Sequence, residues 1–498
     1  MDLDRRSLLL AGAGTVTVAP LAVFAPAEAG RKRTRTFRGE FTDSETPDWH
    51  YLPFRVPQGV RRISVKYRFQ PTDTGIGISY NVVDIGIFDP SGKGLGNEAG
   101  FRGWSGGARR SFTLSRTSAT PGYLPGPITP GVWRIALGPY LITPPGTPYQ
   151  VEVTLHFGRR GRTFEVAPAP TELAGRGPGW YRTDLHTHTF HSDGSRTRGG
   201  LVEEARAAGL DVLGSSEHNT SSATLSWGRH APVDLLVVNG EEVTTRAGHW
   251  LAMGLPAGTW IDWRYRPEDD RLAEFTTRVR ELGGVAIACH PFNPVPSIRW
   301  GFGTDFAHMD AFEIWNGPWT GDDQQAVVNW TRLLNLGRFV PAVGTSDSHN
   351  TGQTVGLAQS VMRLETLSSA AVVAAVTGGH LYVAESSAVA LTFEATAGQA
   401  TASCGDTLTV APTDLVTVTM AASGVPGCVG QLLGPAGVLA GAVATDDSVT
   451  VTVTQPASAL AYVRGEVRRP NTEVNSPVAD MAGSRMVALT NPAFVTSA

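Results

Sequence analysis

The sequence predicts a multidomain protein in which a central α/β barrel, TIM-like but distorted, lies between two β domains. The chain has 498 residues, which is too long for one compact core. In its central part, apolar strand-like runs alternate with helical patterns, as in a parallel sheet or barrel. Both flanking parts instead show short β-rich runs separated by Pro/Gly turns, which is typical of antiparallel β domains.

An export signal is predicted over residues 1–29. Arg5 and Arg6 precede an apolar stretch, broken by glycines and a proline, and Ala27-Glu28-Ala29 then forms a small-x-small cleavage site. The stretch is too short for a stable membrane span. The paired arginines resemble a twin-arginine signal, and a general secretory signal is the alternative. We therefore expect a periplasmic, cell-surface or extracellular protein, exported by the twin-arginine route.

Two β domains are predicted on either side of the centre. The first is a β-sandwich over residues 36–165, and a Gly/Pro/Ala-rich link follows it. Its β-rich runs lie at residues 63–67, 83–87, 133–137 and 151–155. The second is a small domain over residues 386–498, where the helical patterns disappear and alternating strands return. Cys404 and Cys428 lie in this second domain, and the sequence leaves open whether they form a disulfide.

The centre, residues 180–385, is predicted to form the barrel. Helical patterns lie at residues 203–208, 271–282, 326–336 and 370–376. Six or seven strands can be counted, which favours a seven-stranded barrel, slightly smaller than the eight-stranded form. Apolar runs end just before His218, Glu242, His290 and Asp347. Because α/β barrels assemble their active sites at the C-terminal ends of their strands, we expect these side chains to converge.

The residue types at these strand ends predict a metal site. Ten of the twelve histidines lie between positions 186 and 380. Imidazole and carboxylate groups without thiolates are the ligands of hydrolytic metal clusters. Cys289 precedes His290 on a predicted strand, where neighbouring side chains face opposite ways, so it is expected to be a packed core thiol.

Several motifs, taken in order, resemble those of the PHP (polymerase and histidinol phosphatase) superfamily of metal-dependent hydrolases. The match covers roughly Tyr181 to Val383. Its motifs are Asp184-Leu185-His186-Thr187-His188-Thr189 with Ser192-Asp193-Gly194, Ser216-Glu217-His218-Asn219-Thr220, Ala288-Cys289-His290-Pro291 and Gly344-Thr345-Ser346-Asp347-Ser348-His349. Glu217 stands where the family usually has Asp. Gly240-Glu241-Glu242-Val243-Thr244-Thr245, followed by Gly248-His249-Trp250, resembles the exported CehA/McbA branch, which includes carbamate hydrolases.

The resemblance implies two or three divalent metal ions (Mn, Fe or Zn), with one carboxylate bridging them. Carried over by position, the metal ligands are His186, His188, Asp193, His218, Glu242, His249, His290, Asp347 and His349. Glu242 matches the ligand position of the family better than Glu241. Asp193 has an alternative role as a catalytic residue that accepts hydrogen bonds near the substrate. The alternative for His249 is to support a neighbouring ligand.

The expected reaction is attack by a metal-bridged hydroxide on an electrophilic phosphorus or carbonyl carbon. His191, in the loop after the first strand of the barrel, is the catalytic candidate for proton delivery to the leaving group, and a solvent-exposed histidine is the alternative. The first expected function is therefore a phosphoesterase acting on small phosphate mono- or diesters. The second is a hydrolase of carbamate, carboxylic ester or amide bonds.

A third function, from a different class, is a non-catalytic secreted protein that binds metal or glycan. The complete ligand set argues against it. The formal net charge of -4 gives no reason to expect a nucleic acid partner. The expected partner is a small-molecule ester, and the sequence leaves open whether the β domains also contact cell-wall or glycan material.

Overall fold

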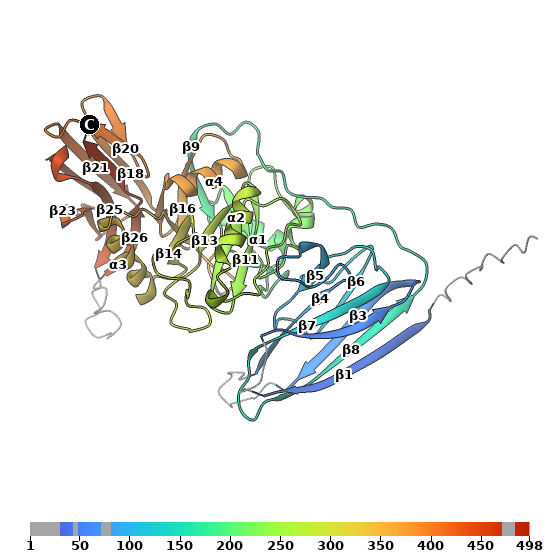
Figure 1. Cartoon of the computed structure of the whole chain (residues 1–498). Coiled ribbons are helices and arrows are strands. Elements are labelled where there is room, and N and C mark those ends of the chain that lie inside the picture. The colour runs from blue at the N-terminus through green and yellow to red at the C-terminus, as the bar shows by residue number, and fades with distance from the viewer. Residues whose placement is uncertain (1–29, 43–47, 71–80, 471–483, 498) are drawn as a thin grey trace, which may run out of the picture.

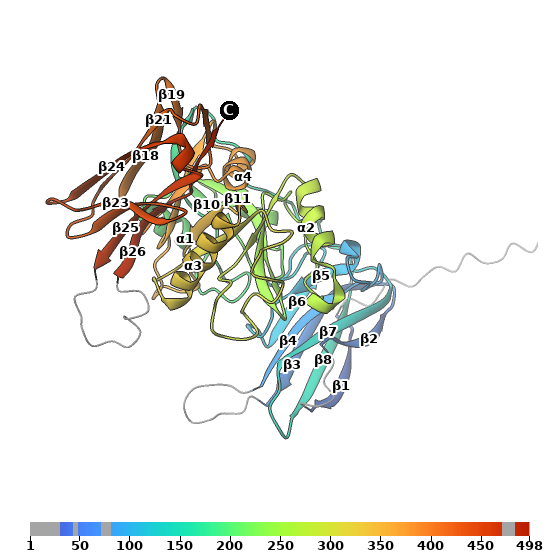
Figure 2. The ribbon, with the colours of Figure 1, turned by 60° about the vertical axis from the view of Figure 1, so that its left-hand side comes forward.

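The computed structural model describes residues 30–42, 48–70, 81–470 and 484–497, and it arranges the chain as three β-rich regions in a row (Figure 1). The N-terminal region lies at one end and the C-terminal region at the other, with the four helices of the described residues between them (Figure 2). No helix in these ranges is long and apolar enough to cross a membrane. The predicted export signal, residues 1–29, lies outside the described residues.

The N-terminal region consists of two antiparallel four-stranded sheets that share one core. The first has the order β1 (Lys32–Phe41), β8 (Thr147–Phe157), β3 (Val60–Phe69) and β6 (Ser111–Ser115). The second has the order β2 (His50–Val56), β7 (Gly131–Leu141), β4 (Val82–Phe88) and β5 (Phe101–Trp104). Alternation along β4 turns Val83, Ile85 and Ile87 into the core. The opposite face of β4 is therefore free to contact the central region.

The central region contributes nine strands to one long sheet. They are β15 (Ala342–Thr345), β14 (Ala311–Asn316), β13 (Val285–Ala288), β12 (Gly248–Met253), β11 (Leu236–Thr245), β10 (Val212–Ser215), β9 (Gly179–Asp184), β16 (Gln359–Leu364) and β17 (Leu381–Ala384), in spatial order. The strands pair in parallel from β9 to β11 and from β13 to β15. In contrast, β12 and β16 run antiparallel to their neighbours.

The antiparallel β12 departs from the parallel sheet that the sequence pattern predicts. Only Arg246 and Ala247 separate β11 from β12. A crossover between parallel strands needs about a dozen residues or more, so two residues allow only a hairpin. The hairpin keeps Glu242 on β11 and His249 on β12 close together.

The two ends of this stretch of sheet approach each other. Gly344 on β15 donates its N–H to the hydroxyl of Ser360 on β16 at 2.9 Å, and this hydroxyl donates back to the carbonyl oxygen of Gly344 at 2.9 Å. A Cβ at Gly344 would lie 2.2 Å from Val383 on β17, so only glycine fits. The sheet thus curls back toward its own edge, and closure into a seven-stranded barrel stays a prediction.

The helices of the described residues cover this sheet. They are α1 (Arg198–Ala207), α2 (Leu272–Glu281), α3 (Gly321–Asn335) and α4 (Ser369–Gly378), one in each of the segments with a helical pattern. The helix α1 begins five residues before its predicted start, because Thr197 accepts a hydrogen bond from the Gly200 N–H and caps it. Likewise, α3 begins early behind a capping box formed by Thr320 and Asp323.

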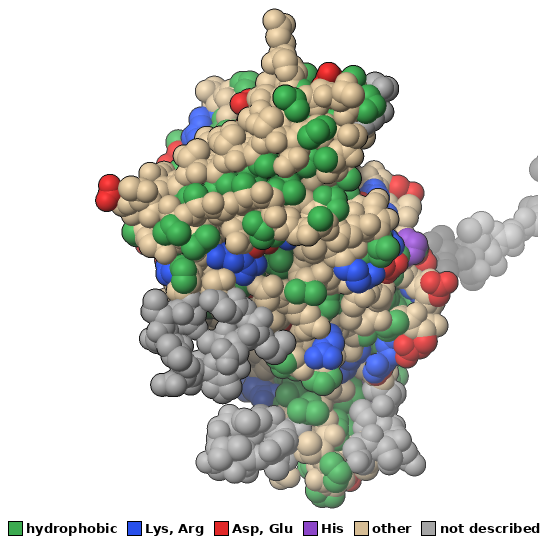
Figure 3. Space-filling model, turned by 90° about the vertical axis from the view of Figure 1, so that its left-hand side faces the viewer, with side chains coloured by type: hydrophobic (Ala, Val, Ile, Leu, Met, Phe, Trp, Pro, Cys, Tyr) green, Lys and Arg blue, Asp and Glu red, His purple; other side chains and the backbone are tan. Residues whose placement is uncertain are grey.

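The C-terminal region continues the central sheet. Residues of β26 (Ser484–Thr490) pair with β17, and β25 (Tyr462–Pro470), β22 (Val429–Gly434) and β23 (Gly437–Val443) follow in order. A second sheet has the order β19 (Ala400–Ala402), β18 (Ala390–Ala397), β21 (Leu415–Ser423) and β24 (Ser448–Pro456), while β20 (Thr407–Val410) pairs with β27 (Ala493–Ser497). Cys404 and Cys428 are free, buried thiols. Charged side chains are sparse on the upper part of this end of the molecule (Figure 3).

Candidate metal centre

The loops that follow the central strands turn the polar side chains toward one point. His218 lies beyond β10, His290 beyond β13 and Asp347 beyond β15. At His290 and Asp347 the backbone is left-handed, with φ values of 27° and 48°. Such a conformation is uncommon for residues other than glycine and breaks the alternation of an extended strand. It therefore lets the side chain of a loop residue point back over the end of its own strand.

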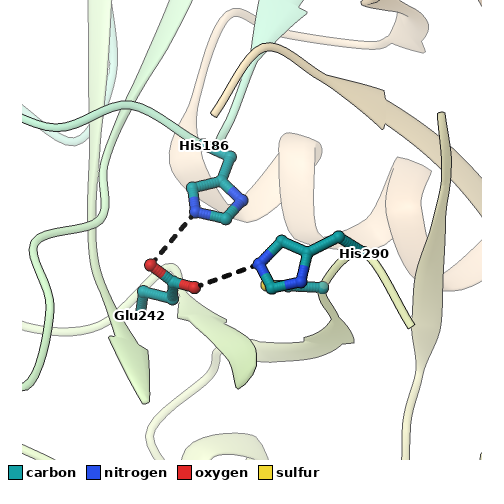
Figure 4. Close-up of side chains that lie close together, drawn as sticks. His186, Glu242 and His290 are labelled. Carbon is teal, nitrogen blue, oxygen red and sulfur yellow. Dashed lines mark ion pairs between the residues drawn. The ribbon is translucent and has the colours of Figure 1, made fainter. Parts of the chain in front are cut away.

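Glu242 lies at the centre of the site and contacts five imidazoles. Its Oε2 lies 3.2 Å from Nε2 of His186, 3.3 Å from Nε2 of His188 and 2.8 Å from Nδ1 of His218. Its Oε1 lies 2.8 Å from Nδ1 of His249 and 3.5 Å from Nε2 of His290. Figure 4 shows how the rings of His186 and His290 approach the carboxylate from two sides. A carboxylate in this position suits the bridging role that the resemblance implies.

Two further carboxylates complete the cluster. Asp347 Oδ1 lies 3.2 Å from Nε2 of both His186 and His188, and 3.5 Å from Nδ1 of His349. Asp193 Oδ1 lies 3.6 Å from Nε2 of His218 and 3.5 Å from Nε2 of His349. The side chain of Asp193 is 47% exposed, whereas those of His186 and His188 are fully buried. The site thus has a buried end and an open end.

The structure brings together every metal ligand expected from the sequence. Ligand atoms within 4.8 Å of one another form four overlapping groups. They are His186, Glu242, Cys289 and His290; His188, Asp193, His218 and His349; His186, His188 and Asp347; and His218, Glu242 and His249. Four residues, His186, His188, His218 and Glu242, each belong to two groups and connect them. Neighbouring ions could therefore share ligands here.

Six buried ligand atoms of the cluster have no hydrogen-bond partner among the described residues. They are Nε2 of His186, His188 and His249, Nδ1 of His290, Oε2 of Glu242 and Oδ1 of Asp347. Leaving such atoms unpaired costs on the order of 1–3 kcal/mol each. Two ligands about 2.1 Å from a tetrahedral cation would lie roughly 3.4 Å apart. Four of these atoms, Nε2 of His186 and His188, Oε2 of Glu242 and Oδ1 of Asp347, make contacts of 3.2 to 3.3 Å that fit that spacing, so the residues suit divalent ions.

Ionisation of the two central carboxylates and of His349 matches ligand chemistry. Burial lowers the pKa values of His186, His188, His218 and His290, but the neighbouring carboxylates outweigh it and raise them, so a bound ion would have to displace protons from these rings. Burial raises the pKa of Glu242, but the fields of His218, His186 and His249 outweigh it, and the pKa lies well below its usual value. For Asp347, burial is likewise outweighed by His186 and His188, and the pKa is lowered. Burial and the neighbouring His188 lower the pKa of His349 to about 4, so this ring is neutral at neutral pH. Anionic carboxylates and a neutral imidazole are the forms that bind metal.

A second layer of carboxylates, Glu313 and Glu217, orients the ligands. Glu313 on β14 accepts hydrogen bonds from Nδ1 of His186 at 2.7 Å and from the backbone N–H of His290 at 2.8 Å. Glu217 accepts a hydrogen bond from the hydroxyl of Ser192 at 2.5 Å, and that hydroxyl lies 3.4 Å from Nδ1 of His188. The only sequence signal for Glu313 is a charged residue inside an apolar strand, Phe312-Glu313-Ile314.

Cys289 lies closer to the cluster than expected. Because the left-handed His290 interrupts strand alternation, the Cys289 sulfur lies within 4.8 Å of ligand atoms of His186, Glu242 and His290. Its thiol is fully buried, and burial holds its pKa well above the usual value. Cys289 is thus a packed core thiol, as predicted, but its sulfur lies near His290 and not on the opposite side of the strand.

The structure does not support His191 as the proton donor. Its side chain is buried, and Nδ1 lies 2.9 Å from the hydroxyl of Ser222, away from the ligand groups. Burial, together with Arg198 and Arg109, lowers its pKa to about 3. A neutral ring that bonds elsewhere cannot protonate a leaving group at neutral pH. This correction leaves Asp193 as the catalytic candidate of the sequence that reaches the cavity.

The open end of the cluster faces a cavity of about 620 Å³. Seven of the nine predicted ligands line it, and His186 and His188 lie behind them. The N-terminal sandwich forms much of the opposite wall, through residues that include Trp49, Asp84, Trp104, Arg110 and Tyr140. A volume of this size accommodates a small organic molecule.

Comparisons with known proteins assign no family. No protein-family model matches the chain, and no curated protein matches it. One similar solved structure is an amidohydrolase from Chromobacterium violaceum with bound sulfate and no metal, at 18% identity, 35% coverage of this chain, 89% of that chain and a TM-score of 0.27.

Another is a family two carbohydrate esterase from Cellvibrio japonicus, at 12% identity, 65% and 94% coverage and a TM-score of 0.14. A salicylyl-acyltransferase from a tetracycline biosynthetic pathway matches at 12% identity, 64% and 86% coverage and a TM-score of 0.15. At these TM-scores the likenesses assign neither a fold nor an activity. The resemblance to the PHP superfamily stays a prediction.

Proposed function

We propose that this chain is an exported metal-dependent hydrolase that holds two or three divalent ions around Glu242 and hydrolyses small phosphate mono- or diesters. One observation carries the proposal: a single buried carboxylate contacts five imidazoles at the wall of a cavity. A site that only stores metal has no need of a substrate-sized cavity beside it. We also propose that the central region is a distorted (β/α)7 barrel of the PHP type.

The donor set favours Zn, Mn or Fe. Imidazole suits zinc and iron, and carboxylate suits manganese. When bound, divalent ions would lower the pKa of a coordinated water and polarise the ester oxygen. Glu242 and Asp347 supply the negative charge that holds the ions together.

The chain's own groups then position the reaction. Glu313 fixes the ring of His186, so that its Nε2 faces the shared carboxylates. Asp193, the exposed carboxylate of the cluster, is placed to accept a hydrogen bond or a proton at the cavity surface. Arg110 and Arg246 also line the cavity, and their positive charge favours an anionic ester over a neutral one.

The test combines metal analysis with a screen on nitrophenyl esters of phosphate, carboxylate and carbamate. We expect the wild-type protein to hold two or three ions per chain and to hydrolyse the phosphate esters. Glu242→Gln should lose both properties, because it removes the bridging charge. The control Glu281→Gln changes an exposed residue of α2 and should lose neither.

Three outcomes would contradict the proposal. Hydrolysis of carbamate or carboxylic esters without phosphate esters would replace the phosphoesterase with the alternative hydrolase. Metal binding without hydrolysis of any ester would favour a non-catalytic binding protein. If the folded protein binds no metal at all, the proposed metal site is wrong.

A further inference from the structure

The second sheet of the sandwich is fixed against the central region. Phe101 of β5 stacks on Trp260 at 4.1 Å between ring centroids, and Trp104 lies 4.7 Å from Trp263. Phe101 and Trp104 belong to the same hydrophobic cluster as the buried strands of the central region. Close packing of these aromatic rings leaves little freedom for the sandwich to move relative to the central region. The sheet is therefore a rigid wall of the cavity.

Side chains of one sheet face form this wall. Asp84 pairs with Gly138 and Gly86 pairs with Trp104, so all four positions face the same side. A Cβ at Gly138 would lie 2.9 Å from Trp49 and 3.0 Å from Trp104. Only glycine allows the two indole rings to approach the strand so closely. The result is a shallow aromatic surface with one carboxylate, Asp84, beside it.

The Asp84 carboxylate makes no hydrogen bond and no contact ion pair with any described residue. Burial raises its pKa to about 6, against the fields of Arg246 and His218, which lower it. Asp193, which also lines the cavity, adds to the increase. The Asp84 side chain is partly exposed at the cavity surface, and a hydrogen-bond donor on a ligand would replace the water that the ligand displaces from it.

Arg246 supplies the complementary group. It lies between the aromatic rings of Trp49 and Tyr140, at 5.1 and 4.8 Å from their centroids. Its one hydrogen bond to a described residue runs from Nη2 to the backbone oxygen of Asp48 at 3.3 Å. The guanidinium therefore keeps donors for a ligand in the cavity that it lines. The aromatic rings hold it in place without using those donors.

We propose that this wall binds the non-reacting part of the substrate, and that this part is a neutral ring bearing hydroxyl groups, such as a sugar or cyclic polyol. One hydroxyl donates to Asp84, another accepts from Arg246, and the ring packs against Trp49, which is partly exposed at the cavity. Asp84 and Arg246 carry opposite charges, so together they favour a neutral polar group over a group with a net charge. The proposal rests on the proposed function, since the phosphate of such an ester would lie at the metal cluster.

Kinetics on a matched pair of esters tests the wall. Glucose 1-phosphate and cyclohexyl phosphate have rings of the same size and differ in their hydroxyls. With the metal-loaded enzyme, Asp84→Asn should lower kcat/KM for glucose 1-phosphate about tenfold, mainly through KM, and leave cyclohexyl phosphate within about twofold. The control Glu152→Gln, on the other sheet of the sandwich, should change neither. Equal losses for both esters, or no loss for either, would overturn the proposal.

A binding measurement separates this proposal from the phosphoesterase. Tryptophan fluorescence reports binding of methyl glucoside and of cyclohexanol to metal-loaded protein, whether or not any ester is hydrolysed. We expect the wild type to bind the glucoside more tightly and Asp84→Asn to lose that preference while keeping its metal. If the wild type prefers the glucoside but hydrolyses no phosphate ester, the proposed binding role of the wall is supported and the proposed phosphoesterase activity is refuted. Absence of preference in the wild type, or its persistence in Asp84→Asn, would refute the wall.

Discussion

Glu313 holds the ring of His186 in a single orientation. Its Oε1 accepts a hydrogen bond from Nδ1 of His186 at 2.7 Å, and both side chains are fully buried. Burial raises the pKa of Glu313, but the field of His186 outweighs it, so the carboxyl is ionised and acts as an acceptor. Nε2 of His186 is left to face Glu242 and Asp347 at 3.2 Å each.

This relationship predicts that Glu313→Gln weakens metal binding. The amide can present its N–H to the ring instead of an oxygen and no longer fixes the tautomer that binds metal. We expect metal affinity to fall about 10- to 100-fold, measured by competition with a chromogenic chelator. The control Glu281→Gln should leave affinity unchanged. Equal affinities for the Glu313→Gln and wild-type proteins would show that Glu313 has no role in orienting His186.

His290→Ala is expected to fold and to lose metal. Its side chain is nearly buried, yet the ring packs among other ligands, so its loss opens space without exposing an apolar core. We expect kcat to fall by more than about a hundredfold, with fewer ions in elemental analysis. His230→Ala, at an exposed histidine outside the cluster, serves as the control. If His290→Ala keeps both its ions and its rate, the residue is not a ligand.

Acid should destabilise the protein through His191. Burial lowers its pKa from about 6.5 to about 3, so the folded state excludes a proton that the unfolded state binds. The stability from this group is complete above pH 6.5 and is lost as the pH falls toward 3, by about 1.4 kcal/mol per pH unit. Urea titrations with chelator present should show a shallower loss between pH 6.5 and 4.5 for His191→Gln than for the wild type. If the free energy of unfolding falls with pH equally steeply in both proteins, the lowered pKa of His191 is contradicted.

The sandwich also fixes the loop that carries Asp193. Arg109, from the N-terminal region, donates to the backbone oxygens of Ser192, at 2.8 Å, and Phe190. Arg109→Ala should release this loop and weaken the open metal group of His188, Asp193, His218 and His349, while the buried ions remain. Metal titration should then show about one equivalent fewer at a given free concentration. Arg134→Ala, at a half-buried residue of β7, is the control, and the same loss in both variants would contradict this role.

The sequence predicted which side chains lie together in the cluster, and it did so for a physical reason. Glu242, His290 and Asp347 each follow or end a short apolar run, and strands of one sheet bring their ends together. Glu313 was not identified as a site residue, because it lies within a strand and contacts the metal ligands only in the folded sheet. Asp84 escaped because it comes from another region of the chain, about a hundred residues before the first ligand, and only packing brings it to the cavity.

Two expectations failed for local reasons. The pattern of apolar runs does not distinguish a parallel strand from an antiparallel one, so the antiparallel direction of β12 was not predicted. The two-residue connection at Arg246 and Ala247 was a signal for it, because so short a connection excludes a crossover. His191 lies three residues after His188, but its ring turns to Ser222 and away from the ligands. Sequence distance from a ligand predicts little about the direction of a loop side chain.

The most direct test of the metal centre is the anomalous diffraction of crystals grown with zinc or manganese. We predict at least two peaks, with the carboxylate of Glu242 bridging two of the ions. Each ion should lie about 2.0–2.2 Å from its imidazole and carboxylate ligands. Peaks confined to the protein surface, with the side chains around Glu242 still in mutual contact and no ion between them, would contradict the account.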